Sequence, residues 1–136
     1  MKQYHIVSRI AIYLLAVVMI SFGIFHFQNA HDLVVYIPSS VPGGIMWVYF
    51  VGAAFILVGL AFIFNKMVKA AAYLLALLLI IFIVIIHIPN YLEAGTKEMR
   101  SMAFVNILKD LAIAGFALHI AAGAHHQKLH LEEDSD

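Results

Sequence analysis

Five side chains that can donate, accept or exchange protons interrupt the apolar stretches of this 136-residue chain: His26, His87, Asn106, Lys109 and Asp110. A charge at the centre of a membrane helix costs on the order of 2.5–3.5 kcal/mol, so such groups are paired or wetted. Asn106, Lys109 and Asp110 have i,i+3 and i,i+4 spacing and therefore project from one helical face. We expect this face to look into the protein and to meet both histidines near one side of the membrane.

Two interpretations of these residues follow from their chemistry. In the first, they line a polar pocket below the outer loops that binds a small polar molecule or a quinone headgroup. Lys109 would be the cation there, and His87 or Asp110 the proton carrier. In the second, Asp110 pairs with Lys109 or with a histidine, and the group is a structural clasp that only satisfies buried polar atoms.

Histidine supplies two further hypotheses. His26 and His87 lie at similar depth on different predicted helices, a pattern that permits the axial ligation of a b-type haem. The spacing of His125, His126 and His130 is marginally suitable for a transition metal. No thiol or carboxylate accompanies these three at fixed geometry, so we predict a solvated tail and no metal site.

Several classes of function are excluded by composition. The chain has no cysteine, which removes disulfides, thiolate nucleophiles and iron–sulfur ligation. Its formal net charge is zero, so no basic field favours nucleic acid. Phosphate-binding loops, dinucleotide fingerprints and catalytic serine or metalloprotease motifs are also missing from the sequence. Neither a catalytic centre nor a resident cofactor is evident, and whether the chain is an enzyme stays open.

The elements that must position the five residues are apolar helices. Hydrophobic residues make up 64% of the chain and charged residues 12%, with a mean hydropathy of +0.97. Roughly 20 apolar residues are needed to cross a bilayer as a helix. We therefore predict an all-α membrane protein of one domain, residues 1–136, with a polar tail at 125–136. Its helices are expected at about 8–27, 45–65, 68–88 and 102–123, the first of them retained because no small-residue cleavage site follows it.

Charges outside these helices predict the orientation of an antiparallel bundle. Five cations fall on the side that carries both termini, namely Lys2, Arg9, Lys66, Lys69 and Lys128, and two on the other, Lys97 and Arg100. Because cytoplasmic loops are enriched in Lys and Arg, both termini are predicted to be cytoplasmic. Pro89-Asn90 is expected to end the third helix.

Small residues in two of the helices predict close helix packing. Gly52, Ala53 and Gly59 in the second helix, with Ala112 and Gly115 in the fourth, would let backbones approach one another. Exposed seams of this kind would also suit a homodimer.

Several short motifs recur in a known pattern: Arg9, the segments 21–27 (SFGIFHF), 36–44 (YIPSSVPGG) and 87–89 (HIP), and above all 106–115 (NILKDLAIAG). Together they resemble the DoxX-like family of small bacterial membrane proteins, and the resemblance extends from Arg9 to Ala122. One position departs from the family pattern, because many members carry a glutamate where Phe55 stands here. No role of that acid can be transferred to this chain.

This resemblance implies a multi-pass protein of the bacterial inner membrane. The namesake members are associated with a thiosulfate:quinone oxidoreductase, and others with redox partners, which implies an accessory subunit linked to a quinone or a redox enzyme. Remote relatives assist the assembly of other membrane proteins, so a non-catalytic assembly factor is the alternative. Membrane lipid is a partner in either case.

The predicted orientation can be tested by labelling, because the chain has no cysteine of its own. In intact cells, an impermeant maleimide should label the variant Ser40→Cys and leave Lys66→Cys unlabelled until the membrane is opened. The reverse result would show that the termini face outward.

Overall fold

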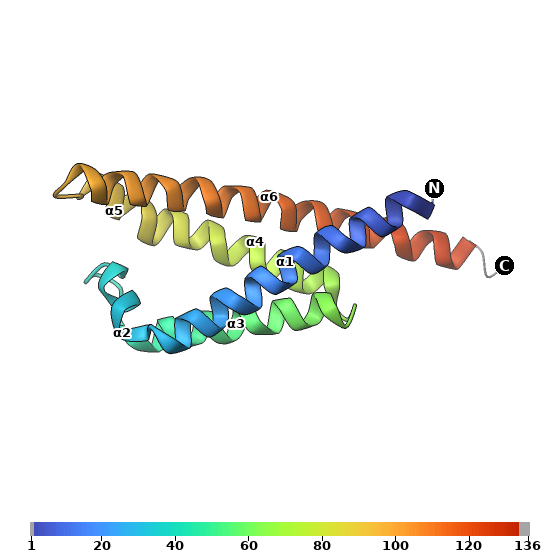
Figure 1. Cartoon of the computed structure of the whole chain (residues 1–136), viewed down its shortest axis with the longest axis horizontal. Coiled ribbons are helices and arrows are strands. Elements are labelled where there is room, and N and C mark those ends of the chain that lie inside the picture. The colour runs from blue at the N-terminus through green and yellow to red at the C-terminus, as the bar shows by residue number, and fades with distance from the viewer. Residues whose placement is uncertain (1, 134–136) are drawn as a thin grey trace.

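The computed structural model describes the backbone of residues 2–133 and the side chains of residues 5–123, and this part of the chain is all-helical. Its elements are α1 (Lys2–Gln28), α2 (Ala30–Leu33), the 3₁₀-helix η1 (Val34–Tyr36), α3 (Ile45–Ile63), α4 (Val68–Phe82), the π-helix η2 (Ile83–His87), α5 (Ile88–Leu92) and α6 (Lys97–Glu133). Figure 1 shows the long helices side by side along one axis.

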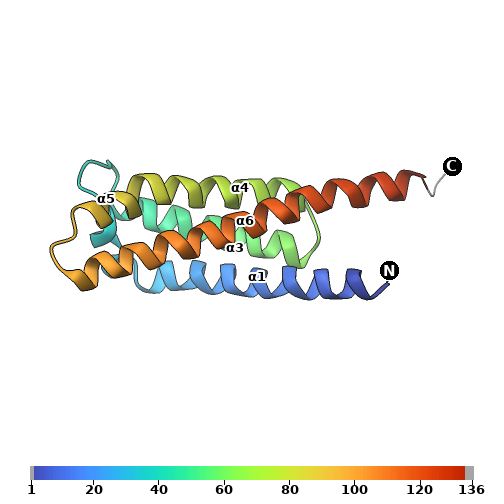
Figure 2. The same ribbon diagram turned by 90° about the horizontal axis from the view of Figure 1, so that it is seen from above.

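Four helical segments are long and apolar enough to cross a membrane: His5–Gln28, Ile45–Ile63, Val68–Leu92 and Lys97–Gly123. They confirm the prediction of an all-α chain with four membrane-length helices and indicate a multi-pass membrane protein. Helix α1 packs along α3, and α4 packs along α6 (Figures 1 and 2). The turn between α3 and α4 lies at the end that holds both chain termini, whereas α2 and α5 lie at the opposite end.

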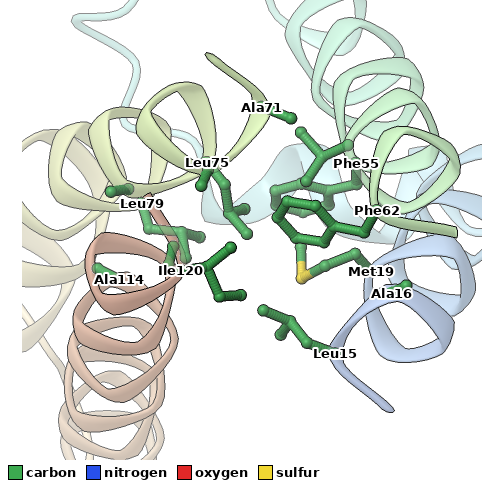
Figure 3. Close-up of a cluster of buried hydrophobic side chains, with 14 of the residues drawn as sticks. Leu15, Ala16, Met19, Phe55, Phe62, Ala71, Leu75, Leu79, Ala114 and Ile120 are labelled. Carbon is green, nitrogen blue, oxygen red and sulfur yellow. The ribbon is translucent and has the colours of Figure 1, made fainter. Parts of the chain in front are cut away.

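The core is formed where the two helix pairs meet. Figure 3 shows side chains from α1, α3, α4 and α6 converging, among them Met19, Phe62, Leu75 and Ile120, which are all at most 5% exposed. Buried alanines such as Ala72 lie between these large side chains. Without a hydrophobic drive between helices in lipid, this close fit of large and small side chains is what holds the pairs together.

The prediction that Pro89-Asn90 ends the third helix is wrong. The helical path runs on from α4 through η2 and α5 to Leu92. Proline lacks an N–H, and in a regular α-helix its ring crowds the carbonyl four residues earlier, here that of Ile85. In η2 the turn is wider, and the Ile88 N–H donates to the Ile83 carbonyl five residues back. This π turn lets the helix pass the proline.

Helix α6 is longer at both ends than the predicted 102–123. Its first turn is capped by Thr96, whose Oγ1 accepts a hydrogen bond from the Met99 N–H at 3.1 Å, and an N-cap threonine favours a helix start at Lys97. The helix then continues to Glu133, through most of the predicted tail. The side chains of His125, His126 and His130 lie outside the described residues, so their metal hypothesis is not addressed.

The loop between η1 and α3 is tied to the far end of the third membrane segment. Asn90 Nδ2 of α5 donates to the Tyr36 carbonyl at 2.9 Å. Gly43 and Gly44 then turn the chain into α3 with φ angles of 105° and 51°, in the region that favours glycine. The two halves of the molecule are therefore joined at this end by a side-chain hydrogen bond as well as by packing.

Close packing of α1 on α3 depends on glycine. A Cβ on Gly23 would lie 2.6 Å from the Gly52 carbonyl oxygen, and one on Gly59 would lie 2.8 Å from the Ala16 carbonyl oxygen. The predicted seam of the second helix is thus present in α3. The seam predicted in the fourth helix is not used inside the chain, because Ala112 and Gly115 are exposed and a Cβ on Gly115 would meet nothing within 4 Å.

This difference gives a matched pair of variants. Gly23→Ala should destabilise the protein by about 1–3 kcal/mol, because the added methyl must push two backbones apart. Gly115→Ala adds the same methyl group at an open position and should change the free energy of unfolding by less than about 0.5 kcal/mol. Unfolding in mixed detergent micelles, followed by circular dichroism, measures both, and equal effects would show that the α1–α3 contact is not tight.

Candidate functional site

Helix α6 brings Asp110 against His87 of η2. The His87 Nε2 atom lies 2.9 Å from Asp110 Oδ2, a hydrogen-bond distance. Asp110 is 3% exposed and is the only buried polar or charged residue among the described side chains. With the carboxylate ionised, the imidazole Nε2–H donates to it, and the buried charge has the partner that it needs.

Lys109 lies on the other side of the same carboxylate. Its Nζ is 3.6 Å from Asp110 Oδ1 and 5.0 Å from the centre of the Phe22 ring on α1. The first distance allows charge attraction and is too long for a hydrogen bond. The second is a cation–π contact between helices that are far apart in sequence. The Lys109 side chain remains 41% exposed, so its ammonium is the accessible charge of the group.

His26 lies beside this group on α1. Its Nδ1 is 2.7 Å from the Phe22 carbonyl, which can only accept, so Nδ1 carries the hydrogen and Nε2 holds the lone pair. The ring meets Phe55 of α3 edge-on with centroids 5.3 Å apart. Phe22 therefore connects His26 to the carboxylate group through Lys109.

Asn106 is not joined to the others. It lies one helical turn before Asp110 and is partly buried, as its spacing predicts, but its side chain makes no hydrogen bond to another described residue. The structure therefore brings His87, Lys109 and Asp110 together, places His26 at their edge, and leaves Asn106 on the same face without a partner. We call His87, Lys109 and Asp110 the polar cluster.

The fourth membrane helix begins at Lys97 and not at the predicted residue 102, so the polar cluster lies further from the start of this helix than expected. Asp110 is 13 residues beyond Lys97, a rise of about 20 Å at 1.5 Å per residue. The first turn of α6 carries the polar residues Lys97, Glu98 and Arg100, which belong at the membrane surface. The cluster is therefore suited to meet a molecule that is itself dissolved in the membrane.

Aromatic rings bound the cluster on the side of α1 and α3. Phe55 is 4% exposed, and its ring centre lies 6.4 Å from that of Phe22 and 6.2 Å from that of Phe82 on α4. Phe55 is thus part of an apolar layer. A low-polarity neighbourhood of this kind strengthens the His87–Asp110 interaction and raises the cost of losing either partner.

An open apolar groove of about 360 Å³ runs along the outward side of α1. It is lined by Val17, Val18, Ser21, Phe22 and Phe25. The Ser21 hydroxyl donates to the Val17 carbonyl of its own helix, so the groove presents little free polarity. Phe22 lines this groove and also contacts Lys109, so the apolar groove lies next to a cation.

Comparisons with known proteins leave the family open. No family model matches the chain, and no curated protein or solved structure matches it. The DoxX-like resemblance therefore stays an interpretation of the residues quoted above.

The sequence did not lead us to predict that Phe22 belongs to this site. Phe22 precedes His26 by one helical turn and so shares its face, a signal that could have placed both near α6. Pro89 was the one sequence signal of the π turn that carries His87, and the prediction took it for the end of the helix.

A double-mutant cycle tests the central pair. His87→Leu and Asp110→Leu should each destabilise the protein, because each leaves the other polar group buried without its partner. The double variant should be less destabilised than the sum of the two, with a coupling of about 0.5–3 kcal/mol. The measurement is unfolding in mixed micelles.

Asn106→Leu combined with His87→Leu is the control, since Asn106 makes no bond to His87. That pair should be additive. Additive behaviour of His87 and Asp110 as well would show that their contact contributes nothing to stability.

Proposed function

We propose that this chain is an accessory protein of the bacterial inner membrane, of the DoxX-like type, that binds the headgroup of a quinone at the polar cluster. The single observation that carries the proposal is the placement of Lys109. Its ammonium is attracted to Asp110 and Phe22 without a direct hydrogen bond to either and is partly exposed beside the α1 groove. It can donate to a carbonyl oxygen of a ring whose isoprenoid tail lies in that groove.

The roles in this site follow from the contacts. Lys109 would hold the headgroup oxygen by a charged hydrogen bond, and the rings of Phe22 and Phe25 would contact the head and tail of the ligand. The His87–Asp110 pair would supply or take up a proton, as imidazole and carboxylate can. The orientation that we propose, with cytoplasmic termini in an antiparallel four-helix bundle, puts the start of α6 at the outer surface and this site, about 20 Å from it, near the middle of the membrane.

The chain's own residues supply no electron carrier, so electrons would come from a partner redox enzyme. A haem held between His26 and His87 would place an electron carrier in the chain; the Nε2 lone pair of His26 is compatible with it, whereas His87 Nε2 is already bonded to Asp110 and would have to give up that bond. In either case the protein would act together with another component and not alone.

A second candidate is an assembly factor for other membrane proteins. The observation that favours it is the outward face of α6, where Ala112 and Gly115 are exposed with open space around Gly115. Such a face can receive a helix of a partner protein or of a second copy. On this hypothesis the polar cluster is a clasp that fixes the fold.

Quinone binding separates the two candidates. Binding of decylubiquinone to the purified protein should weaken about tenfold or more in Lys109→Met, because a hydrogen bond from a charged group contributes about 1.5–3 kcal/mol. Asp110→Asn should weaken binding less, and Lys97→Met, outside the cluster, should bind like the parent. Equal binding by all four proteins, with lower thermal stability in the Lys109 and Asp110 variants, would leave only the clasp.

A second readout is the absorption spectrum of protein purified from its own host. A haem or flavin band supports the redox role, whereas a co-purified membrane protein without a chromophore supports assembly.

A further inference from the structure

The turn between α3 and α4 has a defined geometry. Asn65, with φ 53°, donates its N–H to the Phe62 carbonyl at 3.3 Å, and the Lys66 N–H donates to the Ala61 carbonyl at 3.0 Å. This pair of bonds is the Schellman motif, which ends a helix by satisfying its last carbonyls. Asparagine tolerates the left-handed backbone that the motif requires. The chain direction at Lys66 is thereby fixed.

Met67 follows in a second left-handed conformation. Its φ is 54° and ψ 34°, a region that costs an ordinary side chain about 1–2 kcal/mol. The conformation leaves the Met67 side chain 78% exposed. A flexible apolar side chain is therefore held outward at a position where a glycine or a capping residue would be less strained. No described side chain makes a capping hydrogen bond to the first turn of α4, an end that carries a partial positive charge.

An open groove of about 470 Å³ lies at this turn. It is lined by Leu57, Leu60, Ala61, Phe64, Lys66 and Met67. All of these residues are apolar except Lys66. Lys66 follows the last turn of α3 and so lies near the end of the groove at the α3–α4 turn. Leu57 and Phe64 are 65% and 66% exposed. The groove thus has an apolar surface that runs along the membrane-spanning helix α3, with a cation at one end.

The charge of this end of the molecule is of one sign among the described side chains. Arg9, Lys66 and Lys69 are exposed there. The described acidic side chains all lie elsewhere. Asp32 is in α2, Glu93 follows α5, Glu98 is in the first turn of α6, and Asp110 belongs to the polar cluster. Figure 2 shows α2, α5 and the start of α6 at the end opposite to the α3–α4 turn.

We propose that the groove at the α3–α4 turn is a binding site for an anionic phospholipid. Its acyl chain lies along Leu57, Leu60 and Phe64, under the Met67 side chain, and its phosphate lies against the Lys66 ammonium. The shape fits a lipid because the apolar bed and the cation are arranged in the order of an acyl chain and its headgroup at a membrane surface. The cations among the described side chains at this end, Lys66 above all, favour a net-anionic headgroup over a zwitterionic one. This site is separate from the polar cluster and does not depend on quinone binding.

Quenching by brominated lipids can locate such a site, because bromine on an acyl chain quenches a tryptophan that it touches. The chain has one tryptophan, Trp47, at the opposite end of α3. The variant Trp47→Phe with Phe64→Trp moves the reporter into the groove. In bilayers of mixed composition, brominated phosphatidylglycerol should compete for this reporter about fivefold better than brominated phosphatidylcholine, since one lysine near an anionic surface contributes about 1 kcal/mol.

Two controls decide the assignment. Lys66→Gln in the reporter chain should bring the headgroup preference close to one, whereas Lys97→Gln, at the other end, should leave it unchanged. In the unmodified chain, Trp47 should show no preference. Equal quenching of the groove reporter by both lipids would overturn the proposal, and so would an absence of quenching by either lipid, which would mean that protein fills the groove.

The unmodified chain provides a measurement that does not depend on the reporter. In native mass spectrometry from mild detergent with added phosphatidylglycerol, the parent should retain a bound lipid that Lys66→Gln loses and Lys97→Gln keeps. Equal retention by all three proteins would contradict a site at Lys66.

Discussion

The His87–Asp110 hydrogen bond is the interaction on which the rest of the structure depends. A carboxylate that is 3% exposed within an apolar helix must have a partner, and among the described side chains the imidazole of the neighbouring membrane segment is the group that bonds to its Oδ2. This requirement fixes the register of α4 and η2 against α6. It also fixes Lys109, because the residue that precedes Asp110 on the helix is turned from it by about 100° and so faces α1.

The contact of Lys109 with Phe22 extends this constraint to the other helix pair. Phe22 is part of the aromatic layer with Phe55 and Phe82, which packs α1 and α3 against α4. The two pairs are therefore joined by one polar contact and by one apolar layer at the same level. Aromatic rings cover the polar cluster on that side, and Lys109 is its most exposed member, with a side chain 41% exposed against 15% for His87.

The sequence was sufficient to predict the four apolar helices, since hydropathy over 20 residues depends little on tertiary contacts. The i,i+3 and i,i+4 rule predicted that Asn106 shares a helical face with Lys109 and with Asp110, a relation that depends only on helix geometry. What could not be predicted depends on neighbours. Pro89 is accommodated by a π turn, and the same turn carries the His87 that bonds to Asp110 of α6. Gly52 and Gly115 are both glycines in apolar helices, and the sequence does not distinguish them. The fold does, because a Cβ on Gly52 would meet the backbone of α1, whereas a Cβ on Gly115 would meet open space.

The clasp and the binding site need not be alternatives, because the two oxygens of Asp110 are used differently. Oδ2 takes a 2.9 Å hydrogen bond from His87, and Oδ1 has Lys109 at 3.6 Å, a distance of attraction alone. A ligand carbonyl can therefore take a hydrogen bond from Lys109 without breaking one inside the protein. The His87–Asp110 bond would persist and keep the helices in register. Stability then depends mainly on the buried pair, and ligand affinity on the exposed lysine, so different residues of one cluster carry the two properties.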